Sequence, residues 1–420
     1  MIQINRTLTS PNNEVCFRAW PLDRRRRVRQ FCGTHVMKIA RIAPLTYSPG
    51  ELEYFSFIRS GAGAEHHQNP YFYVFPSGDV LMHWMAYDFD ECSNNAVQLY
   101  SISKDRGLHW SDPQIYMADY VGGVPYLRLI RLAGGSDALM FQIQTIMEEL
   151  VVDEDLRIST GGGNYFNSRT RVSLRRSIDA GRSFDHGQEI PYEMITGGKS
   201  LPAVGFYGSL DDVIQLHDGR IVAAFIWMDP DRSDIAGQYQ HYTGSCLMSD
   251  DTGRTWKPSR VPVVSDTKRG VMEIQMVETA PRRIFALFRT KSGFIHQTIS
   301  EDGGEMWSAS APTTLPSPES MPRMIKLNSG KLLLVWNNVS STTQQPRHPL
   351  SAATSSDGGQ TWSKPKIIAD EVGENQLSNH GVVQLDDGRI LLCLSHYHAS
   401  RPMVDDLDMA IFDEAWLARG

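Results

Sequence analysis

Short apolar runs, some of them alternating with polar residues, follow one another along the chain and predict strands rather than helices. Four pairs of runs fold about glycine-containing turns and indicate hairpins, at residues 73–84, 213–226, 324–336 and 382–394. Residues 274–288 repeat the pattern with a longer turn, and residues 126–143 give a looser copy. Helical periodicity is almost absent. The pattern therefore predicts an all-β fold with six hairpins.

A second repeat, Ser-x-Asp-x-Gly-x-x-aromatic, follows the first five hairpins, at Ser103–Trp110, Ser177–Phe184, Ser249–Trp256, Ser300–Trp307 and Ser355–Trp362. In such a turn the Asp accepts hydrogen bonds from the turn's own amides, and the Gly adopts a conformation that is closed to other residues. The aromatic ring packs against its own sheet. Six hairpins and five such turns indicate six repeated sheets, the last without the turn.

The two ends of the repeat region carry apolar runs that belong to no hairpin. Residues 408–417 read as a final strand with no turn after it, and residues 39–57 precede the first hairpin. A propeller has to close its ring, and a strand from one terminus commonly completes the sheet at the other. We therefore predict a six-bladed β-propeller at residues 37–420, with residues 39–57 as the donated strand.

Composition and charge narrow the class of partner. The formal net charge of −7 over 420 residues argues against nucleic acid or an anionic membrane surface as partner. No apolar stretch is long enough for a membrane-spanning helix. Five irregularly spaced cysteines form no metal or disulfide signature, so we expect no cofactor and a reducing compartment. No feature of the sequence indicates the oligomeric state.

Residues 1–36 are basic, with arginines at positions 24–27 and 29, and no apolar run of signal-peptide length follows them. We expect a disordered extension, because such charge runs are usually solvated; the alternative is a basic interaction arm. The absence of a signal-peptide pattern predicts a cytoplasmic location.

The repeated turns resemble those of the sialidase superfamily, the Asp-box or BNR-repeat six-bladed propellers, over residues 37–417. Residues 347–362 are especially similar, as is Glu273 with the hairpin that ends in Phe288-Arg289-Thr290. The resemblance implies action on a carbohydrate, with three arginines that grip a substrate carboxylate, a Tyr–Glu nucleophile pair and an Asp acid/base. Arg289 and Arg347 match two of the arginines, and Glu273 matches the glutamate. Residues 66–70 and 377–381 replace the expected first arginine and the tyrosine, so an ordinary sialidase is not implied.

The residues just before each hairpin are expected to converge on one funnel at the propeller axis. Counting back from each turn glycine gives a polar set, with Glu273 in the analogous place of the fourth hairpin: Asn69, Asp211, Met321, Asn379 and His380. Burying such groups costs free energy unless they are paired or hydrated, which favours a functional funnel. Asn69 and Asn379 are therefore predicted to bind substrate.

Glu273 and Asp211 offer the pair of carboxyl groups that glycoside hydrolysis needs, one protonated and one ionised. The alternative for Glu273 is a salt bridge to Arg289 or another arginine. Arg289 and Arg347 could clamp a sugar carboxylate through their planar guanidinium groups, or tie two blades together.

Histidines gather in the first and last hairpins, which become neighbours when the ring closes: His66, His67, His83, His380, His396 and His398. One interpretation gives them sugar-binding or proton-transfer roles, with His67 and His380 catalytic and His83 and His396 substrate-binding. A second is a metal site at the His-x-His pair of residues 396 and 398, and a third is ordinary packing. Our prediction names no metal.

The leading functional hypothesis is an exo-acting glycoside hydrolase that removes a terminal sugar, an acidic sugar being one candidate. The second is a polysaccharide or oligosaccharide lyase, in which a histidine abstracts a proton from a uronic acid and Arg289 or Arg347 neutralises its carboxylate. The third is a glycan-binding propeller without catalysis.

Overall fold

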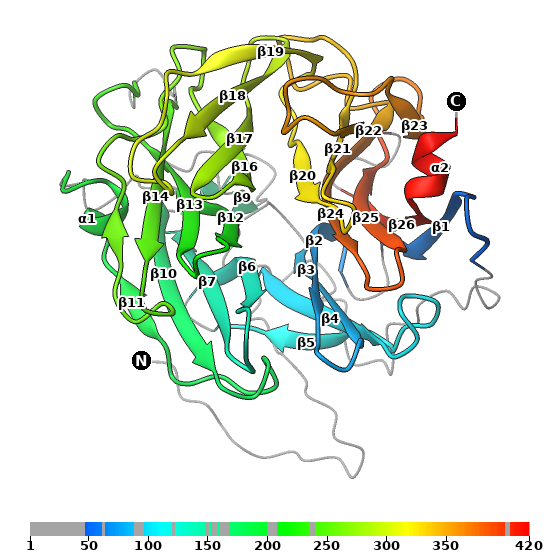
Figure 1. Cartoon of the computed structure of the whole chain (residues 1–420), viewed down its shortest axis with the longest axis horizontal. Helices are drawn as coiled ribbons and strands as arrows, with labels where there is room; N and C mark the ends of the chain where they lie inside the picture. The colour runs from blue at the N-terminus through cyan, green and yellow to red at the C-terminus, as the bar shows by residue number, and fades with distance from the viewer. Residues whose placement is uncertain are drawn as a thin grey trace.

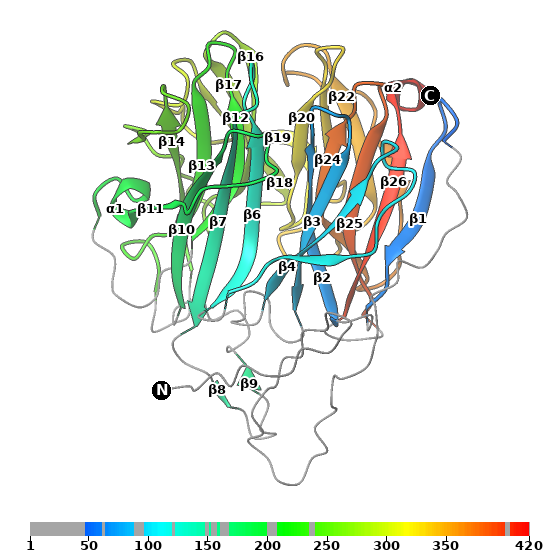
Figure 2. The ribbon, with the colours of Figure 1, turned by 90° about the horizontal axis from the view of Figure 1, so that it is seen from below.

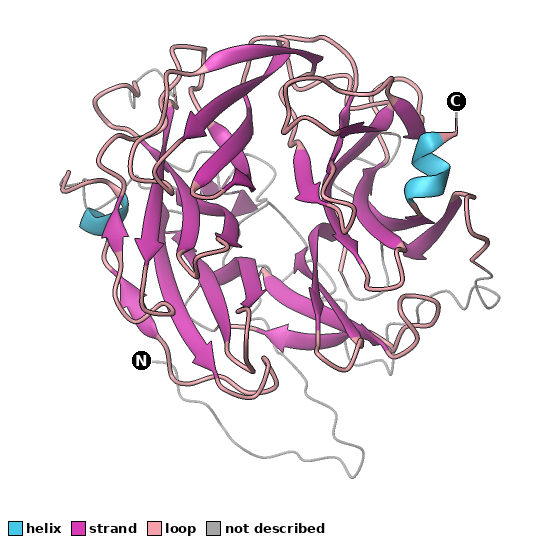
Figure 3. Ribbon diagram, in the orientation of Figure 1, coloured by secondary structure: helices cyan, strands magenta, loops and turns pink. Residues whose placement is uncertain are grey.

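The computed structural model describes residues 47–60, 64–87, 96–119, 122–147, 151–152, 158–159, 168–199, 208–234, 240–399 and 404–419. The predicted extension at residues 1–36 lies outside this part of the chain. The described fold is all-β, as predicted, with two short helices at the periphery (Figure 3). None of the described helices is long and apolar enough to cross a membrane.

Four sheets have four strands each, paired in antiparallel fashion with chain neighbours adjacent. The first contains β6 (Gly123–Arg131), β7 (Ala138–Met147), β10 (Ser168–Ser177) and β11 (Gln188–Ile190). The second contains β12 (Gly208–Gln215), β13 (Ile221–Met228), β14 (Tyr242–Ser249) and β15 (Lys257–Pro258). The third contains β16 (Met272–Ala280), β17 (Arg283–Arg289), β18 (Phe294–Ser300) and β19 (Ala311–Pro316). The fourth contains β20 (Arg323–Lys326), β21 (Leu332–Asn337), β22 (Leu350–Ser355) and β23 (Lys366–Ala369).

An eight-stranded sheet holds both ends of the repeat region and consists of two groups of four strands. One group contains β2 (His66–Val74), β3 (Val80–Tyr87), β4 (Val97–Ser103) and β5 (Gln114–Met117). The other contains β24 (Gln376–Gln384), β25 (Ile390–Tyr397), β26 (Asp405–Phe412) and β1 (Glu53–Ile58). A single parallel pair, His66 with Asp405, joins the groups. A two-stranded sheet, β8 (Val151–Val152) with β9 (Ile158–Ser159), lies apart.

The six predicted hairpins are all present, as β2–β3, β6–β7, β12–β13, β16–β17, β20–β21 and β24–β25. The first strand of each hairpin lies innermost, and the sheets are arranged around a common centre (Figure 1). These inner strands contact one another in a closed sequence: β2, β6, β12, β16, β20, β24 and again β2. In the side view the strands run along the direction of this axis (Figure 2).

Apolar side chains fill the space between neighbouring sheets. β13 and β14 are buried at every position because other sheets cover both of their faces. The largest apolar cluster joins the sheets of β6, β12 and β16, and smaller clusters join the remaining sheets. The core therefore lies between the sheets.

The two ends of the repeat region meet as predicted. β1 pairs in antiparallel fashion with β26, from Glu53 opposite Ile411 onward, which confirms a donated strand at the end of the predicted range. Residues 39–46 of that range lie outside the described residues, and residues 47–52 are not strand. The prediction of strand as far as residue 417 is wrong, because α2 (Glu414–Ala418) begins after β26. Asp413 caps this helix: its Oδ1 accepts a hydrogen bond of 2.7 Å from the Trp416 N–H. The other short helix, α1 (Tyr192–Ile195), follows β11.

The five repeated turns share one hydrogen-bond network. Each Ser Oγ donates to the Asp Oδ1 at 2.7–2.9 Å and accepts from the Gly N–H at 2.7–2.9 Å. Gly253 shows why glycine is needed there: its φ is +81°, and a Cβ would lie 2.9 Å from Leu139 Cδ1. The turn glycines lie against side chains of the neighbouring sheet, as Gly253 does against Leu139 of β7 and Gly359 against Phe285 of β17.

Candidate active site

Three residues predicted from the hairpin turns share an unusual backbone conformation. Asn69, Glu273 and Asn379 have φ values of 53°, 53° and 48°, in the left-handed region that L-residues rarely adopt. Each lies at a register shift in an inner strand, β2, β16 or β24. A bulge redirects the side chain that it carries, and such backbone strain costs about 1–3 kcal/mol per residue and clusters at functional sites. The inner strands therefore present polar side chains at equivalent places of three hairpins.

Glu273 is ion-paired with Arg289, which lies beside it on β17. Arg289 Nη1 is 3.1 Å and 3.2 Å from the two carboxylate oxygens. The Arg289 side chain is only 7% exposed, whereas the Glu273 side chain is 23% exposed. The salt bridge considered as an alternative from the sequence is therefore present, and it leaves the Glu273 carboxylate accessible to solvent.

Asp211 lies at a bulge in β12 and reaches the neighbouring strand. Its Oδ2 accepts a hydrogen bond of 2.8 Å from the N–H of Ile274, the residue directly after Glu273. Burial raises the pKa of Asp211 well above its usual range; the Ile274 N–H opposes this shift, and the negative charge of Glu273 adds to it. The two carboxyl groups predicted as a pair are therefore electrostatically coupled, with Asp211 the more deeply buried.

Arg347 and Arg289 meet around a residue that sequence reasoning did not identify, Glu319. Arg289 Nη2 is 3.5 Å from Glu319 Oε1, and Arg347 Nη2 donates to the Glu319 backbone carbonyl at 3.1 Å. Arg347 also donates to the Gln344 carbonyl at 3.2 Å and to Ser378 Oγ at 3.5 Å. The two predicted substrate-binding arginines are thus close together, and both are committed to partners within the protein.

Three of the predicted histidines are completely buried. His67 Nδ1 accepts from Trp84 Nε1 at 3.1 Å, His83 Nδ1 lies 3.1 Å from Gln98 Oε1, and His380 Nε2 lies 2.9 Å from the Val335 carbonyl. Burial lowers the pKa of His67 to about 4 and the pKa values of His83 and His380 to about 3. Their rings are therefore neutral near neutral pH and inaccessible to a solute in this conformation.

His396 stands on β25 among carboxylates. Its Nδ1 is 2.7 Å from Asp408 Oδ2, and its Nε2 is 3.0 Å from Glu371 Oε1. Burial lowers its pKa, but the Asp408 hydrogen bond and the carboxylate charges outweigh burial, so the net shift is upward. The centroids of the His396 and His398 rings are 4.1 Å apart. The Nε2 of His398 lies 2.9 Å from Asp406 Oδ2. Within the described part of the chain no cluster of His, Cys, Asp and Glu could hold a metal ion.

Asn69 and Asn379 flank Gln68, another residue that sequence reasoning did not single out. Asn379 Nδ2 donates to Gln68 Oε1 at 3.5 Å, and Gln68 Nε2 donates to Asp405 Oδ2 at 2.8 Å. Asn69 Nδ2 is buried and finds no acceptor among the described residues. The first and last hairpins are therefore linked by a chain of polar side chains from Asn379 through Gln68 to Asp405.

Glu319 has a weak sequence signal, because it stands between Pro318 and Pro322, two residues before the Met321 position of the predicted set. Counting back from the hairpin turn gave Met321, but the prolines shorten the inner strand so that β20 begins only at Arg323. The polar residue that reaches the site therefore comes from the preceding segment.

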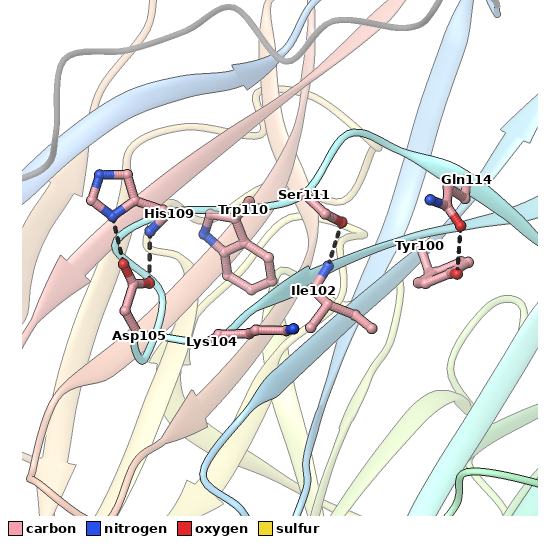
Figure 4. Close-up of a pocket in the computed structure, with 8 residues that line it drawn as sticks. All are labelled: Tyr100, Ile102, Lys104, Asp105, His109, Trp110, Ser111 and Gln114. Atoms are coloured by element: carbon pink, nitrogen blue, oxygen red, sulfur yellow. Dashed lines mark hydrogen bonds and ion pairs between the residues drawn. The ribbon is translucent and has the colours of Figure 1, made fainter.

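A pocket of about 430 Å³ lies on the outer part of the first hairpin group, away from these residues (Figure 4). It is lined by β4, the first repeated turn and the start of β5, including Tyr100, Asp105 and Trp110. The turn's own bonds occupy several of its polar groups, with Tyr100 Oη donating to Gln114 Oε1 at 2.7 Å and Asp105 paired with His109. None of the predicted site residues lines this pocket.

The fold and the site together define the class of protein. A search of solved structures gives many matches, among them sialidases. The Hadza microbial sialidase Hz136 has a TM-score of 0.62 at 16% identity, covering 84% of this chain and 67% of its own. The NanB sialidase of Streptococcus pneumoniae, as the K499G mutant, has a TM-score of 0.62 at 15% identity, covering 85% and 70%. A protein of unknown function from Dyadobacter fermentans has a TM-score of 0.65 at 20% identity, covering 87% and 100%. These likenesses establish a sialidase-like fold.

The family follows from the sequence itself. The model of the BNR repeat-like domain matches residues 156–392, more than half of the chain, and the protein belongs to this family of the sialidase superfamily. No curated protein matches the chain.

Proposed function

We propose that the six hairpin groups are the blades of a six-bladed β-propeller and that the five repeated turns are its Asp boxes. The closed sequence of contacts among the inner strands supports this interpretation. So do the pairing of β1 with β26, which completes the last group, and the identical Ser–Asp–Gly networks in the turns. In this arrangement the beginnings of the inner strands surround one funnel.

The protein acts, in our proposal, as an exo-glycoside hydrolase that removes a terminal sugar. The observation that carries it is the pairing of Asp211 with Glu273 in contrasting environments. Asp211 is buried with a raised pKa, whereas Glu273 is partly exposed in an ion pair with Arg289. Glycosidic bond cleavage requires two carboxyl groups with different roles, one that supplies a proton and one that acts as base or nucleophile.

Asp211 is proposed as the general acid, protonating the leaving oxygen, and Glu273 as the base or nucleophile. The hydrogen bond from Ile274 uses one Asp211 oxygen and leaves the other to carry the proton. Asn69 and Asn379 are proposed to bind sugar hydroxyls. Because the acid must be protonated, kcat/KM should fall as the pH rises through the raised pKa of Asp211. In an Asp211→Asn variant, the kcat/KM that remains should no longer fall as the pH rises over this range.

The lyase hypothesis has less support. A general base works best when its pKa lies near the working pH, whereas burial lowers the pKa of His67 to about 4 and that of His380 to about 3. A glycan-binding propeller without catalysis needs no proton-transfer group. Product analysis distinguishes it from the hydrolase.

The experiment is a screen of aryl glycosides and uronate-containing oligosaccharides, with reducing sugar and ultraviolet absorbance measured in the same wells. Release of reducing sugar without a new absorbance is the expected result. An unsaturated, absorbing product would instead favour the lyase. Glycan binding with no product in either channel would favour the binding module.

A further inference from the structure

Glu319 is a buried carboxylate surrounded by cations. Its Oε1 lies 2.7 Å from Arg269 Nη1 and 3.5 Å from Arg289 Nη2, and its Oε2 lies 3.4 Å from Lys291 Nζ. The Glu319 side chain is 1% exposed, whereas those of Arg269 and Lys291 are 21% and 26% exposed. The carboxylate thus occupies the inner end of a cationic cluster whose outer end faces solvent.

The backbone of Glu319 is fixed as well. Its N–H donates to the Thr343 carbonyl at 2.8 Å, and its carbonyl accepts from Arg347 Nη2 at 3.1 Å. Burial tends to raise the pKa of Glu319, but the charges of Arg289, Arg269 and Lys291 outweigh burial and lower it. The residue is therefore held in place from both its main chain and its side chain.

A carboxylate is also the ligand that a pair of arginines would otherwise recognise from outside. Arg289 already faces two carboxylates of the protein, Glu273 and Glu319, and Arg347 donates to three internal oxygens. A substrate carboxylate at Arg289 would have to displace Glu319 and leave a buried charge without its partners, which is strongly unfavourable.

We propose that the Glu319 carboxylate is an internal occupant of the anion-binding position formed by Arg269, Arg289 and Lys291, and that the enzyme consequently selects a terminal sugar without a carboxylate group. This inference rests on the proposed hydrolase function and specifies its substrate class. It gives the arginines a positioning role, with Arg289 holding Glu273 and Arg347 holding the segment that carries Glu319.

The first test compares aryl glycosides that differ only in a hydroxymethyl or a carboxylate group, such as glucoside with glucuronide and galactoside with galacturonide. The wild-type protein should prefer the neutral member of a pair by roughly 10²-fold in kcat/KM. In Glu319→Gln, which keeps the side-chain shape and loses the charge, the preference should fall by about tenfold or more. A wild-type preference for the uronide would overturn the proposal.

The second test needs no turnover. Glu319→Ala should leave a carboxylate-sized site among the cations, so sodium acetate or formate should raise its melting temperature relative to the same concentration of sodium chloride. Wild type and Glu301→Ala, which breaks a surface pair with Arg283, should show no such difference. Equal effects of acetate on all three proteins would contradict the internal-anion role.

The two tests distinguish the possible failures. If no glycoside is hydrolysed but acetate stabilises only Glu319→Ala, the hydrolase proposal fails and the anion-binding position stands. If glycosides are hydrolysed with no dependence on Glu319 in either test, the substrate-class inference fails alone. Should Glu319→Ala not fold, free glucuronate added to Glu319→Gln replaces it: stabilisation of the variant beyond wild type is expected, and equal behaviour would contradict the proposal.

Discussion

At the scale of single residues, the site depends on side chains held in an unfavourable backbone conformation. Glu273 has a φ of 53°, which a residue with a Cβ adopts only at a cost. We predict that Glu273→Gly is more stable than Glu273→Ala by roughly 1 kcal/mol, although both lack the carboxylate. Urea unfolding of the two variants measures this difference. Equal stabilities would mean that the backbone at this position is not strained.

The positions of these unusual backbone conformations could be anticipated from the sequence, because the hairpin repeat sets a nearly constant distance between the turn and the bulge. Counting back from the turn glycines identified Asn69 and Asn379, and Glu273 was placed by analogy in the fourth hairpin; all three share the left-handed conformation and the bulge. Glu319 could not be found in this way, since its cations come from Arg269, Arg289 and Lys291, around the neighbouring hairpin. A local sequence pattern cannot predict a side-chain contact between two sheets.

At the scale of elements, β1 joins the two ends of the repeat region. It pairs with β26, and its residue Phe57 packs edge-on against Trp84 of β3 and Trp110 of the first repeated turn, with ring centroids 6.2 Å and 5.6 Å apart. Phe57 is 1% exposed. Phe57→Ala should therefore reduce the free energy of unfolding by about 3–5 kcal/mol, because it opens a cavity at this junction.

The matched control is Phe294→Ala, at a side chain that is 40% exposed at the start of β18. This change should alter stability by no more than about 0.5 kcal/mol in urea unfolding. Similar losses in the two variants would show that β1 is not a critical closing element. The sequence predicted the donated strand from the need to close a ring, but not its bounds, since among the described residues before the first hairpin the ladder begins at Glu53.

At the scale of the whole molecule, the buried histidines give the fold a dependence on pH. The unfolded chain takes up protons at His67, His83 and His380 near pH 6.5, whereas in the folded protein their pKa values are lowered to about 4, 3 and 3. Folding stability should therefore decrease as the pH falls from 6.5 toward 4. His396, whose pKa is raised, acts in the opposite direction and loses its contribution as the pH rises.

The measurement is the free energy of unfolding in urea at a series of pH values between 7 and 4.5. His83→Gln should show a shallower decline than wild type, because one of the three lowered groups no longer titrates. A wild-type stability that stays constant over this range would contradict the buried, neutral state of these histidines.

Hydrophobic periodicity and repeated turns were sufficient to predict the all-β class, the six hairpins and their order along the chain. The roles of the histidines could not be predicted at this scale. Clustering in the first and last hairpins places His83 and His396 in one region, but burial depends on how neighbouring sheets pack. His83 is completely buried, and His396 is surrounded by carboxylates that come from different elements.

The most direct test of the central claim is the rate of aryl-glycoside hydrolysis by wild type and Glu273→Gln, with Glu278→Gln as the control. Glu278 is a carboxylate at the other end of the same strand, bonded to the His217 N–H at 2.6 Å. We predict that Glu273→Gln lowers kcat by about 10³-fold or more, since it removes the proposed base or nucleophile while keeping the side-chain shape. Glu278→Gln should retain the wild-type rate. Equal rates for wild type and Glu273→Gln would contradict the assignment of catalysis to this funnel.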